Sequence, residues 1–482
     1  MLIIQTPQLT QLFPYKKMSL WISWYELVAA LRPAFSRHRT FLWFLTVLAA
    51  FSLRPDLRGV SSFVRALGLN ELSYDSLLHF FHSSGIDIDK LSRLWLLIVL
   101  RHFPVHRIDQ RPVLILDGLK NPKEGRKMPA VKHLHQQSES NTKPHFIMGH
   151  SFQAFGVLCR VGSYYFCVPV CARIHEGIVE SNRSRKTLID KACSLLKDVC
   201  QEQQFILLAD AYYANGKMVD ALNNAESELV TRVRSNSVGF MPAIQPKKAK
   251  RGRPKKYGKK IVLHKLFATL NRFEVMRTSV YGEREVEVRY RVLDLLWKPA
   301  GKTVRFVLID HPHRGRLILL CTDLTRSAQD IILLYSLRFK IEVSFKHAIH
   351  SIGTFGYRFW MADMKPLKRK SGNQYLHHET KEYREHVHRK MRAYHIFVQC
   401  GAIAQGMLNY LAMTQKEQVW KHFGSWIRTI RPDVLPSEAI VSDALKNTFP
   451  EFLHQHSGAS RWSKFLLSRI DSNRAEGTRL AS

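Results

Sequence analysis

The sequence predicts an α/β protein in which an all-β segment interrupts a mixed sheet core, with helical regions at both ends. Three observations lead to this class. Apolar residues recur at helical spacing through residues 1–108. Two apolar, strand-like runs in residues 109–228 each end in an aspartate, and strand-like segments then fill residues 229–322. A helical pattern returns in residues 323–356 and continues through residues 357–482, which are also rich in basic residues.

The first region, residues 1–108, is expected to be a helical unit that binds DNA, mediates dimerisation or does both. Proline or glycine residues separate its four apolar segments, which are Trp21–Leu31, Phe41–Leu53, Tyr74–His82 and Ile88–Phe103. The second segment lies between Arg39 and Arg54 and is shorter than the roughly 20 residues that cross a bilayer. It therefore indicates a buried helix rather than a membrane span.

The charge of the chain points to a polyanionic partner. Its 482 residues include 73 Lys and Arg against 39 Asp and Glu, a formal net charge of +34. Such an excess opposes compaction unless a polyanion screens it, so nucleic acid is the favoured partner and a membrane surface the weaker alternative. Hydrophobic residues make up 45% of the chain, which excludes a globally disordered protein. Seven cysteines cannot all pair and show no zinc spacing, which indicates buried, reduced thiols in the cytoplasm.

The core region, residues 109–228, opens with the strand-like run 111–117 and later contains a second such run at 204–210. Between them lie three further β-like segments and one amphipathic helix candidate, at 146–155, 156–160, 163–170 and 184–200. Strand ends form the rim of a sheet, where ligands bind in α/β proteins. Asp117 and Asp210, which end the two apolar runs, are therefore candidate site residues.

The β-rich insertion, residues 229–322, contains a basic loop at 247–260. This loop includes Arg251-Gly-Arg253-Pro, which resembles the core of an AT-hook, so Arg251 and Arg253 are candidate minor-groove contacts. A solvated loop that binds the DNA backbone without sequence preference is the equally open alternative.

A single helix is expected from Ser327 to Ile352, with a cap-like start and Gly353 as its stop. The spacing of Tyr335, Arg338 and Glu342 places these three side chains on one helical face, and Lys346 lies one turn further on.

Asp117, Asp210 and Glu342 together suggest metal-dependent chemistry on a phosphodiester. Converging carboxylates repel one another unless a cation neutralises them, and hard oxygen ligands suit Mg²⁺ or Mn²⁺. Two such ions about 4 Å apart can activate an attacking oxygen and stabilise the leaving oxygen. We therefore predict these three residues as catalytic metal ligands for two Mg²⁺ ions within a basic, DNA-holding surface.

These residues carry a family resemblance. The chain resembles a DDE transposase of bacterial insertion sequences, of the insertion-sequence-four-like group, over about residues 30–415. The matching pieces are Leu116-Asp117-Gly118, Pro122 to Pro129, His135 to Lys143, Gly149-His150, Leu208-Ala-Asp210-Ala-Tyr-Tyr213 and Tyr335-x2-Arg338-x3-Glu342. The β-rich insertion also falls where that group places it, between the second Asp and the Glu.

The resemblance implies a ribonuclease H-like core with Asp117, Asp210 and Glu342 as metal ligands. It implies that Tyr335 and Arg338 contact phosphates, that water frees a 3′-hydroxyl at the element's end, and that this hydroxyl attacks target DNA. It further implies terminal inverted repeats as partner, a homodimer on DNA, and a bacterial, nucleoid-associated location. The signature has Lys seven residues after the Glu; that position is Ile349 here, and Lys346 is the candidate substitute.

Two other functions remain open from the sequence: a domesticated, non-catalytic DNA-binding protein, and a nuclease without strand transfer. Three further residues have alternative roles. His150 could orient water or phosphate, or it could be structural. Trp297 and Trp360 are predicted to pack in the core, the alternative being that they stack on an unpaired base near a cleaved end.

Overall fold

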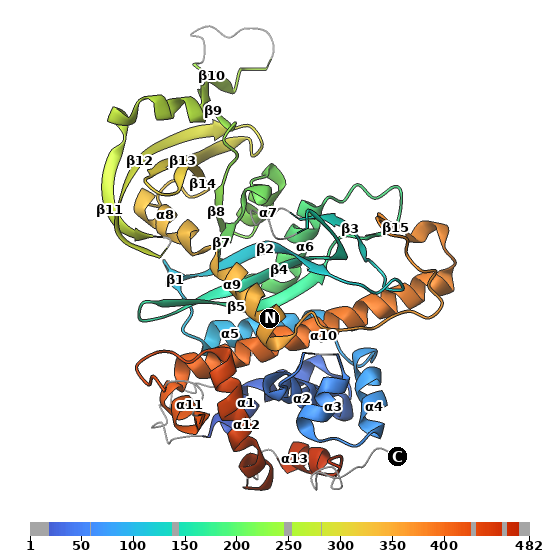
Figure 1. Cartoon of the computed structure of the whole chain (residues 1–482). Helices are drawn as coiled ribbons and strands as arrows, with labels where there is room; N and C mark the ends of the chain where they lie inside the picture. Colours follow the sequence, from blue (N-terminus) through green and yellow to red (C-terminus); the bar gives the residue numbers. More distant parts are fainter. Residues whose placement is uncertain are drawn as a thin grey trace, which may run out of the picture.

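The computed structural model describes residues 19–57, 59–136, 144–244, 253–280, 282–425, 430–455 and 460–471. Within this part of the chain, thirteen strands join in one mixed sheet (Figure 1). Its central five strands are β2 Arg111–Pro122, β4 Phe146–Val161, β5 Tyr164–Ile174, β7 Ile206–Ala209 and β8 Glu228–Arg232.

The order of these five strands is β5-β4-β2-β7-β8. The first three in the chain are antiparallel neighbours, whereas β7 runs parallel to β2 and β8 runs parallel to β7. This arrangement is a ribonuclease H-like core, so the predicted fold class is confirmed. Two helices connect its later strands: α6 Leu188–Cys200 lies between β5 and β7, and α7 Gly216–Asn224 lies between β7 and β8.

The central strand β2 is buried on both faces, which explains its unbroken apolar run. Leu114 and Leu116 point into the larger hydrophobic core, while Val113 and Ile115 point into a second one. A strand covered on both sides favours consecutive apolar residues over alternation. The two cores therefore fix the strand, and with it the residue that follows, Asp117.

The insertion extends the same sheet, because β14 pairs antiparallel with β8. Its strands are β9 Val238–Pro242, β10 Tyr257–Val262, β11 Glu274–Val280, β12 Glu283–Trp297, β13 Lys302–His311 and β14 Gly315–Cys321. Two short strands complete the sheet, β1 Arg107–Ile108 and β3 Lys132–His135, while β6 Ile178–Val179 and β15 Gln374–Tyr375 pair as a separate two-stranded sheet. Residues 257–260 belong to β10, so the expected basic loop is shorter than predicted; residues 245–252, including Arg251, lie outside the described residues.

Helices from both ends of the chain share one core beneath the sheet in Figure 1. They are α1 Leu20–Ala29, α2 His38–Leu53, α3 Ser61–Leu67, α4 Leu72–Phe81 and α5 Ile88–His102, with α10 Lys381–Thr414, α11 Lys416–Phe423, α12 Glu438–Gln455 and α13 Ser460–Leu467. The rings of Trp24 and Trp462 stack 5.6 Å apart, and Trp21 Nε1 donates to the Leu445 carbonyl at 2.9 Å. The proposed division into regions stays a prediction, but the two helical regions pack as one unit.

Two apolar helices are buried by the rest of the protein. The segment Phe41–Leu53 lies within α2 and is buried, as predicted. The helix α10 is long and apolar enough to cross a membrane by composition, yet 94% of that apolar window is buried inside the structure. Its apolar length is therefore explained by core packing. The seven cysteines are all free, and six of them are buried.

The expected single helix from Ser327 to Ile352 is wrong. The chain forms α8 Ala328–Leu337 and α9 Lys340–His347, and then a π-helical turn, η5 Ala348–Ile352. At the break, the N–H groups of Arg338 and Glu342 bond to carbonyls three residues back instead of four. The intervening sequence has neither proline nor glycine, so the sequence carries no signal for this break.

Arg54 ties α2 to the far end of this three-part helix. Its side chain is 5% exposed and its Nη2 donates to the carbonyls of Ile352 at 2.6 Å and Gly353 at 3.0 Å. Its Nη1 donates to Ser62 Oγ at 3.0 Å, and the guanidinium lies 4.5 Å from the Phe51 ring centroid. The buried Arg54 guanidinium therefore supplies the hydrogen-bond donors for the backbone carbonyls that end the helical segment carrying Glu342.

We expect Arg54→Met to lower the free energy of unfolding by about 2–4 kcal/mol, because it leaves buried carbonyls without donors. Urea unfolding measures this loss. The matched control is Arg65→Ala, which removes an exposed ion pair with Asp56 and should cost less than about 1 kcal/mol. Equal losses in the two variants would contradict this role for Arg54.

Candidate active site

Asp117 and Asp210 lie on neighbouring parallel strands, just past the point where the pairing between those strands ends. Asp117 follows Leu116 on β2, Asp210 follows Ala209 on β7, and these two preceding residues are register partners in the parallel pair. Asp210 also begins a short 3₁₀ turn, η2 Ala211–Tyr213. The parallel pairing therefore places the two aspartates side by side, but the prediction that Asp117 ends its strand is wrong, because β2 continues to Pro122 by pairing with β4.

Arg338 links Glu342 to Asp117. Its Nη1 donates to Asp117 Oδ2 at 2.9 Å, and its Nη2 donates to Glu342 Oε1 at 2.5 Å. Arg338 caps α8 and Glu342 lies in the first turn of α9, so the break between these helices points both side chains at β2. Two acids that are far apart in the sequence thus share one guanidinium.

The electrostatics of the site favour a cation. Burial raises the pKa of Asp117 from its usual 3.8 to about 6; Arg338 and the Gly118 N–H act to lower it, and Asp210 and Glu342 act to raise it. Burial acts to lower the pKa of Arg338, but Asp117 and Glu342 raise it above its usual value, so the guanidinium stays charged. The site therefore holds more negative charge than one arginine comfortably neutralises.

Gln153 and Tyr213 support the backbone at Asp117. Gln153 Nε2 donates to the Asp117 carbonyl at 3.2 Å and to the Tyr213 hydroxyl at 2.8 Å. Gln153 is 1% exposed and lies on β4 opposite Gly118. Sequence reasoning missed this residue, although a lone amide within the apolar run from Phe152 to Leu158 is a signal that could have found it.

The other predicted residues are placed as follows. Lys346 is exposed one turn beyond Glu342. Tyr335 is 8% exposed and packs in the second core, so its ring is turned away from solvent. Arg253 is exposed, four residues before β10 begins.

His150 is a structural residue. It is completely buried, its Nε2 lies 2.8 Å from the Pro129 carbonyl, and the Tyr357 hydroxyl lies 3.0 Å from its Nδ1. Burial lowers its pKa to about 3, so the ring is neutral. Of its two alternative roles, the structure favours the structural one.

Carboxylate oxygens at this edge fit a divalent ion by their chemistry, although Arg338 now occupies two of them. Among the described residues, the group of ligands whose atoms lie within 4.8 Å of one another is Glu283, His311 and His313, on the insertion. His311 Nδ1 there accepts the N–H groups of His313 and Arg314 at 3.2 Å, so the neutral ring carries its proton on Nε2. That trio is therefore poorly suited to a metal.

The strand order and the two aspartates at its edge define the class of ribonuclease H-like enzymes. Residues 30–292, more than half of the chain, match the DDE superfamily endonuclease family, and the chain belongs to this family. Nucleases of this superfamily generally depend on divalent metal ions. The match includes Asp117 and Asp210 and ends before Glu342.

No curated protein matches the chain. Among solved structures, it resembles the piggyBac transposase in its synaptic complex with hairpin DNA, at 10% sequence identity and a TM-score of 0.36. The alignment covers 96% of this chain and 88% of that chain, but a similarity this low supports no conclusion.

The raised pKa of Asp117 predicts a pH effect on stability. A carboxyl that binds its proton more tightly in the folded state stabilises the fold below about pH 4 and loses that contribution as pH rises through 6. When the pH rises from 5 to 7.5, the unfolding free energy of wild type should therefore fall by on the order of 1 kcal/mol relative to that of Asp117→Asn. Urea unfolding at both pH values tests this, and parallel pH profiles would argue against a raised pKa.

Proposed function

We propose that this DDE endonuclease is a DNA transposase that binds the terminal inverted repeats of a mobile element, cuts at its ends and joins them to target DNA. The single observation that carries the proposal is the bridge through Arg338. It supplements the family match, which ends before Glu342, because it links that third acid to Asp117.

In the proposal, Asp117, Asp210 and Glu342 hold two divalent metal ions, Mg²⁺ or Mn²⁺. Such ions supply an activated attacking oxygen and a stabilised leaving oxygen. Ion binding and Arg338 compete for the same oxygens of Asp117 and Glu342, so Arg338 is expected to turn to a DNA phosphate when the acids bind metal. Its fork of donors suits that task.

The positions of the other residues refine the proposed DNA contacts. Exposed Lys346 can reach a backbone phosphate, and exposed Arg253, together with Arg251, remains a candidate contact from the insertion. Buried Tyr335 is left out of the proposed DNA contacts. Because two DNA ends must be handled together, a homodimer on DNA belongs to the proposal, as do the insertion-sequence-four-like group and a nucleoid-associated location.

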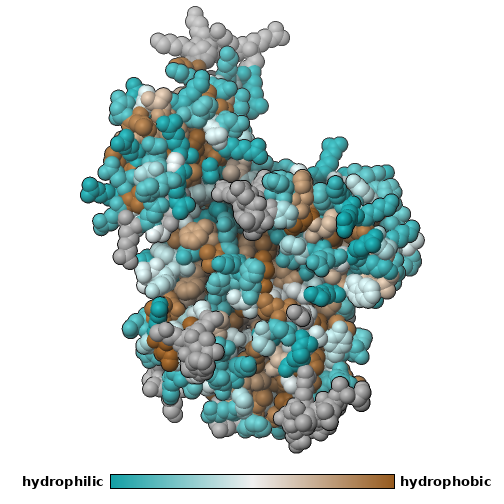
Figure 2. All heavy atoms as spheres, in the orientation of Figure 1, coloured by the Kyte–Doolittle hydropathy of each residue, from teal (hydrophilic) through white to brown (hydrophobic). Residues whose placement is uncertain are grey.

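On the face shown in Figure 2, hydrophilic residues cover much of the insertion and the right-hand side of the ribonuclease H-like region. With a net charge of +34, a surface of this kind attracts a polyanion over a long range.

We expect Asp117→Asn, Asp210→Asn and Glu342→Gln each to reduce cleavage of end-containing DNA at least about 10³-fold while end binding persists, because each removes a metal-ligand charge. The assay is the release of labelled 3′ ends with Mg²⁺, using the inverted repeats that flank the gene. Asp220→Asn is the matched control, since Asp220 is exposed on α7 away from the strand ends, and it should cut like wild type.

The same reaction with a target plasmid distinguishes the functions that the sequence leaves open. A transposase gives joined molecules, a nuclease gives cuts alone, and a binding protein gives neither. Full cleavage by any one of the three acid variants would remove that residue from the proposed site.

Because binding is proposed to rest on phosphate contacts, affinity for duplex DNA should fall at least about tenfold between 50 and 200 mM salt. Fluorescence anisotropy measures this. Glu342→Gln removes no cation, so it should show the same salt dependence as wild type; a flat response in both proteins would contradict extensive phosphate contact.

A further inference from the structure

A short extended segment, residues 357–361, connects the Glu342 helices to the C-terminal region. Its side chains alternate: Tyr357, Phe359 and Met361 are buried, at 1%, 6% and 4% exposure, whereas Arg358 and Trp360 are exposed. Trp360 is 68% exposed, while every other described tryptophan is at most 7% exposed. The prediction that Trp297 is a core residue is confirmed, and the same prediction for Trp360 is wrong.

The buried residues hold this segment firmly. The Tyr357 ring stacks on Tyr394 with 4.5 Å between centroids, and Phe359 packs 5.4 Å from Phe81. Lys123 Nζ donates to the carbonyl of Phe355 at 2.5 Å and to that of Tyr357 at 3.1 Å. Arg358 and Trp360 are therefore displayed from a fixed support, and the exposure of Trp360 does not come from loose packing.

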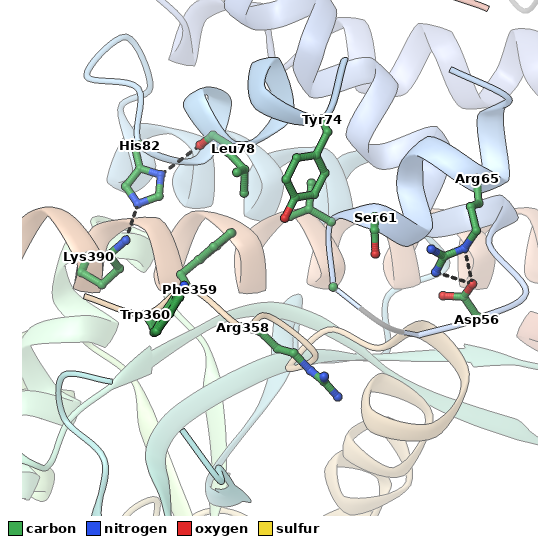
Figure 3. Close-up of a pocket in the computed structure, with 12 residues that line it drawn as sticks. Asp56, Ser61, Arg65, Tyr74, Leu78, His82, Arg358, Phe359, Trp360 and Lys390 are labelled. Atoms are coloured by element: carbon green, nitrogen blue, oxygen red, sulfur yellow. Dashed lines mark hydrogen bonds and ion pairs between the residues drawn. The ribbon is translucent and has the colours of Figure 1, made fainter. Parts of the chain in front are cut away.

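Arg358 and Trp360 line a hollow of about 770 Å³ between this segment, α3, α4 and α10 (Figure 3). Tyr74 lies on the opposite wall and is 41% exposed. Two large aromatic side chains left in contact with water within one hollow are unusual for a protein surface and mark an interaction site.

The charges in the hollow suit an anion. Arg65 is paired with Asp56 at 2.8 Å, and Lys390 Nζ lies 3.1 Å from His82 Nε2. His82 Nδ1 faces the Leu78 carbonyl at 2.9 Å, and burial lowers the pKa of His82, so its ring is neutral and Lys390 keeps its charge. Arg358 forms no ion pair within the part of the chain that the structure describes, so two cations remain available beside the aromatic rings.

A second hollow of about 850 Å³ borders the same two side chains, since Arg358 and Trp360 line both. The second hollow reaches Asn121 and Pro122, at the end of the strand that carries Asp117, and also Ile349, where the family signature has Lys. A ligand that lies along both hollows thus leads toward the proposed active site.

We propose that Trp360 and Arg358 form a subsite for an unpaired DNA strand, in which Trp360 stacks on a base while Arg358 and Lys390 hold its phosphates. This inference rests on the proposed function, because it names the form of DNA that the site takes. An aromatic face accepts a base whose own face is free, which a continuous duplex does not offer. A base beside its phosphate meets an aromatic face and a cation together, and the net charge of +34 attracts a polyanion, so the observations favour DNA.

The test is fluorescence anisotropy with a labelled 12-nucleotide thymidine oligonucleotide and with a blunt duplex, in metal-free buffer and with the full chain. Trp360→Ala should weaken single-strand binding about tenfold and duplex binding less than about twofold. Trp360→Phe should keep most of the single-strand affinity. Arg358→Gln should weaken single-strand binding and reduce its salt dependence.

Two control variants lie outside the hollow. Tyr164→Ala removes an aromatic ring that is 47% exposed at the start of β5, and Lys446→Gln removes an exposed cation on α12; both should bind the oligonucleotide like wild type. Unchanged single-strand binding by Trp360→Ala would overturn the subsite, and so would equal losses for single strand and duplex.

A parallel cleavage assay with Mg²⁺ separates this inference from the proposed function. If wild type does not cut but its single-strand binding depends on Trp360, the catalytic proposal fails and the subsite stands. If wild type cuts and Trp360→Ala binds the single strand normally, the subsite alone fails.

Discussion

A carboxylate at the end of an apolar run within a strand needs a positive charge, and this requirement organises the centre of the molecule. Asp117 cannot move away from its position, because the strand before it is packed into a hydrophobic core on each face. Arg338, the residue at which α8 ends, provides the charge. The insertion makes this possible, since its last strand pairs with β8 and returns the chain to the core close to where it left.

The sequence indicated the parts of the site that depend on local pattern. Asp117 and Asp210 follow apolar runs that can only be buried strands, and parallel pairing places their ends together. The contact between Arg338 and Glu342 follows from their spacing, which survives the change from one helix to two. The family match supports the overall interpretation but does not test the roles of these residues.

The parts that sequence reasoning missed depend on tertiary contacts. The helix break at Arg338 has no glycine or proline signal, because it arises from a contact with a strand far away in the chain. Tyr335 was predicted to contact DNA, with a place in the core as the alternative, and its side chain packs in the second hydrophobic core. Trp360 was assigned to the core on the general preference of tryptophan, and its alternation with Tyr357 and Phe359 was the missed signal.

The buried guanidinium of Arg54 joins two parts of the chain that a division into separate modules would keep apart, α2 and the helices around Glu342. The helix carrying Glu342 is fastened at its far end to α2, which belongs to a bundle built from both termini of the chain. The terminal helices and the helix that carries the acid at position 342 therefore belong to one packed body rather than to separate modules.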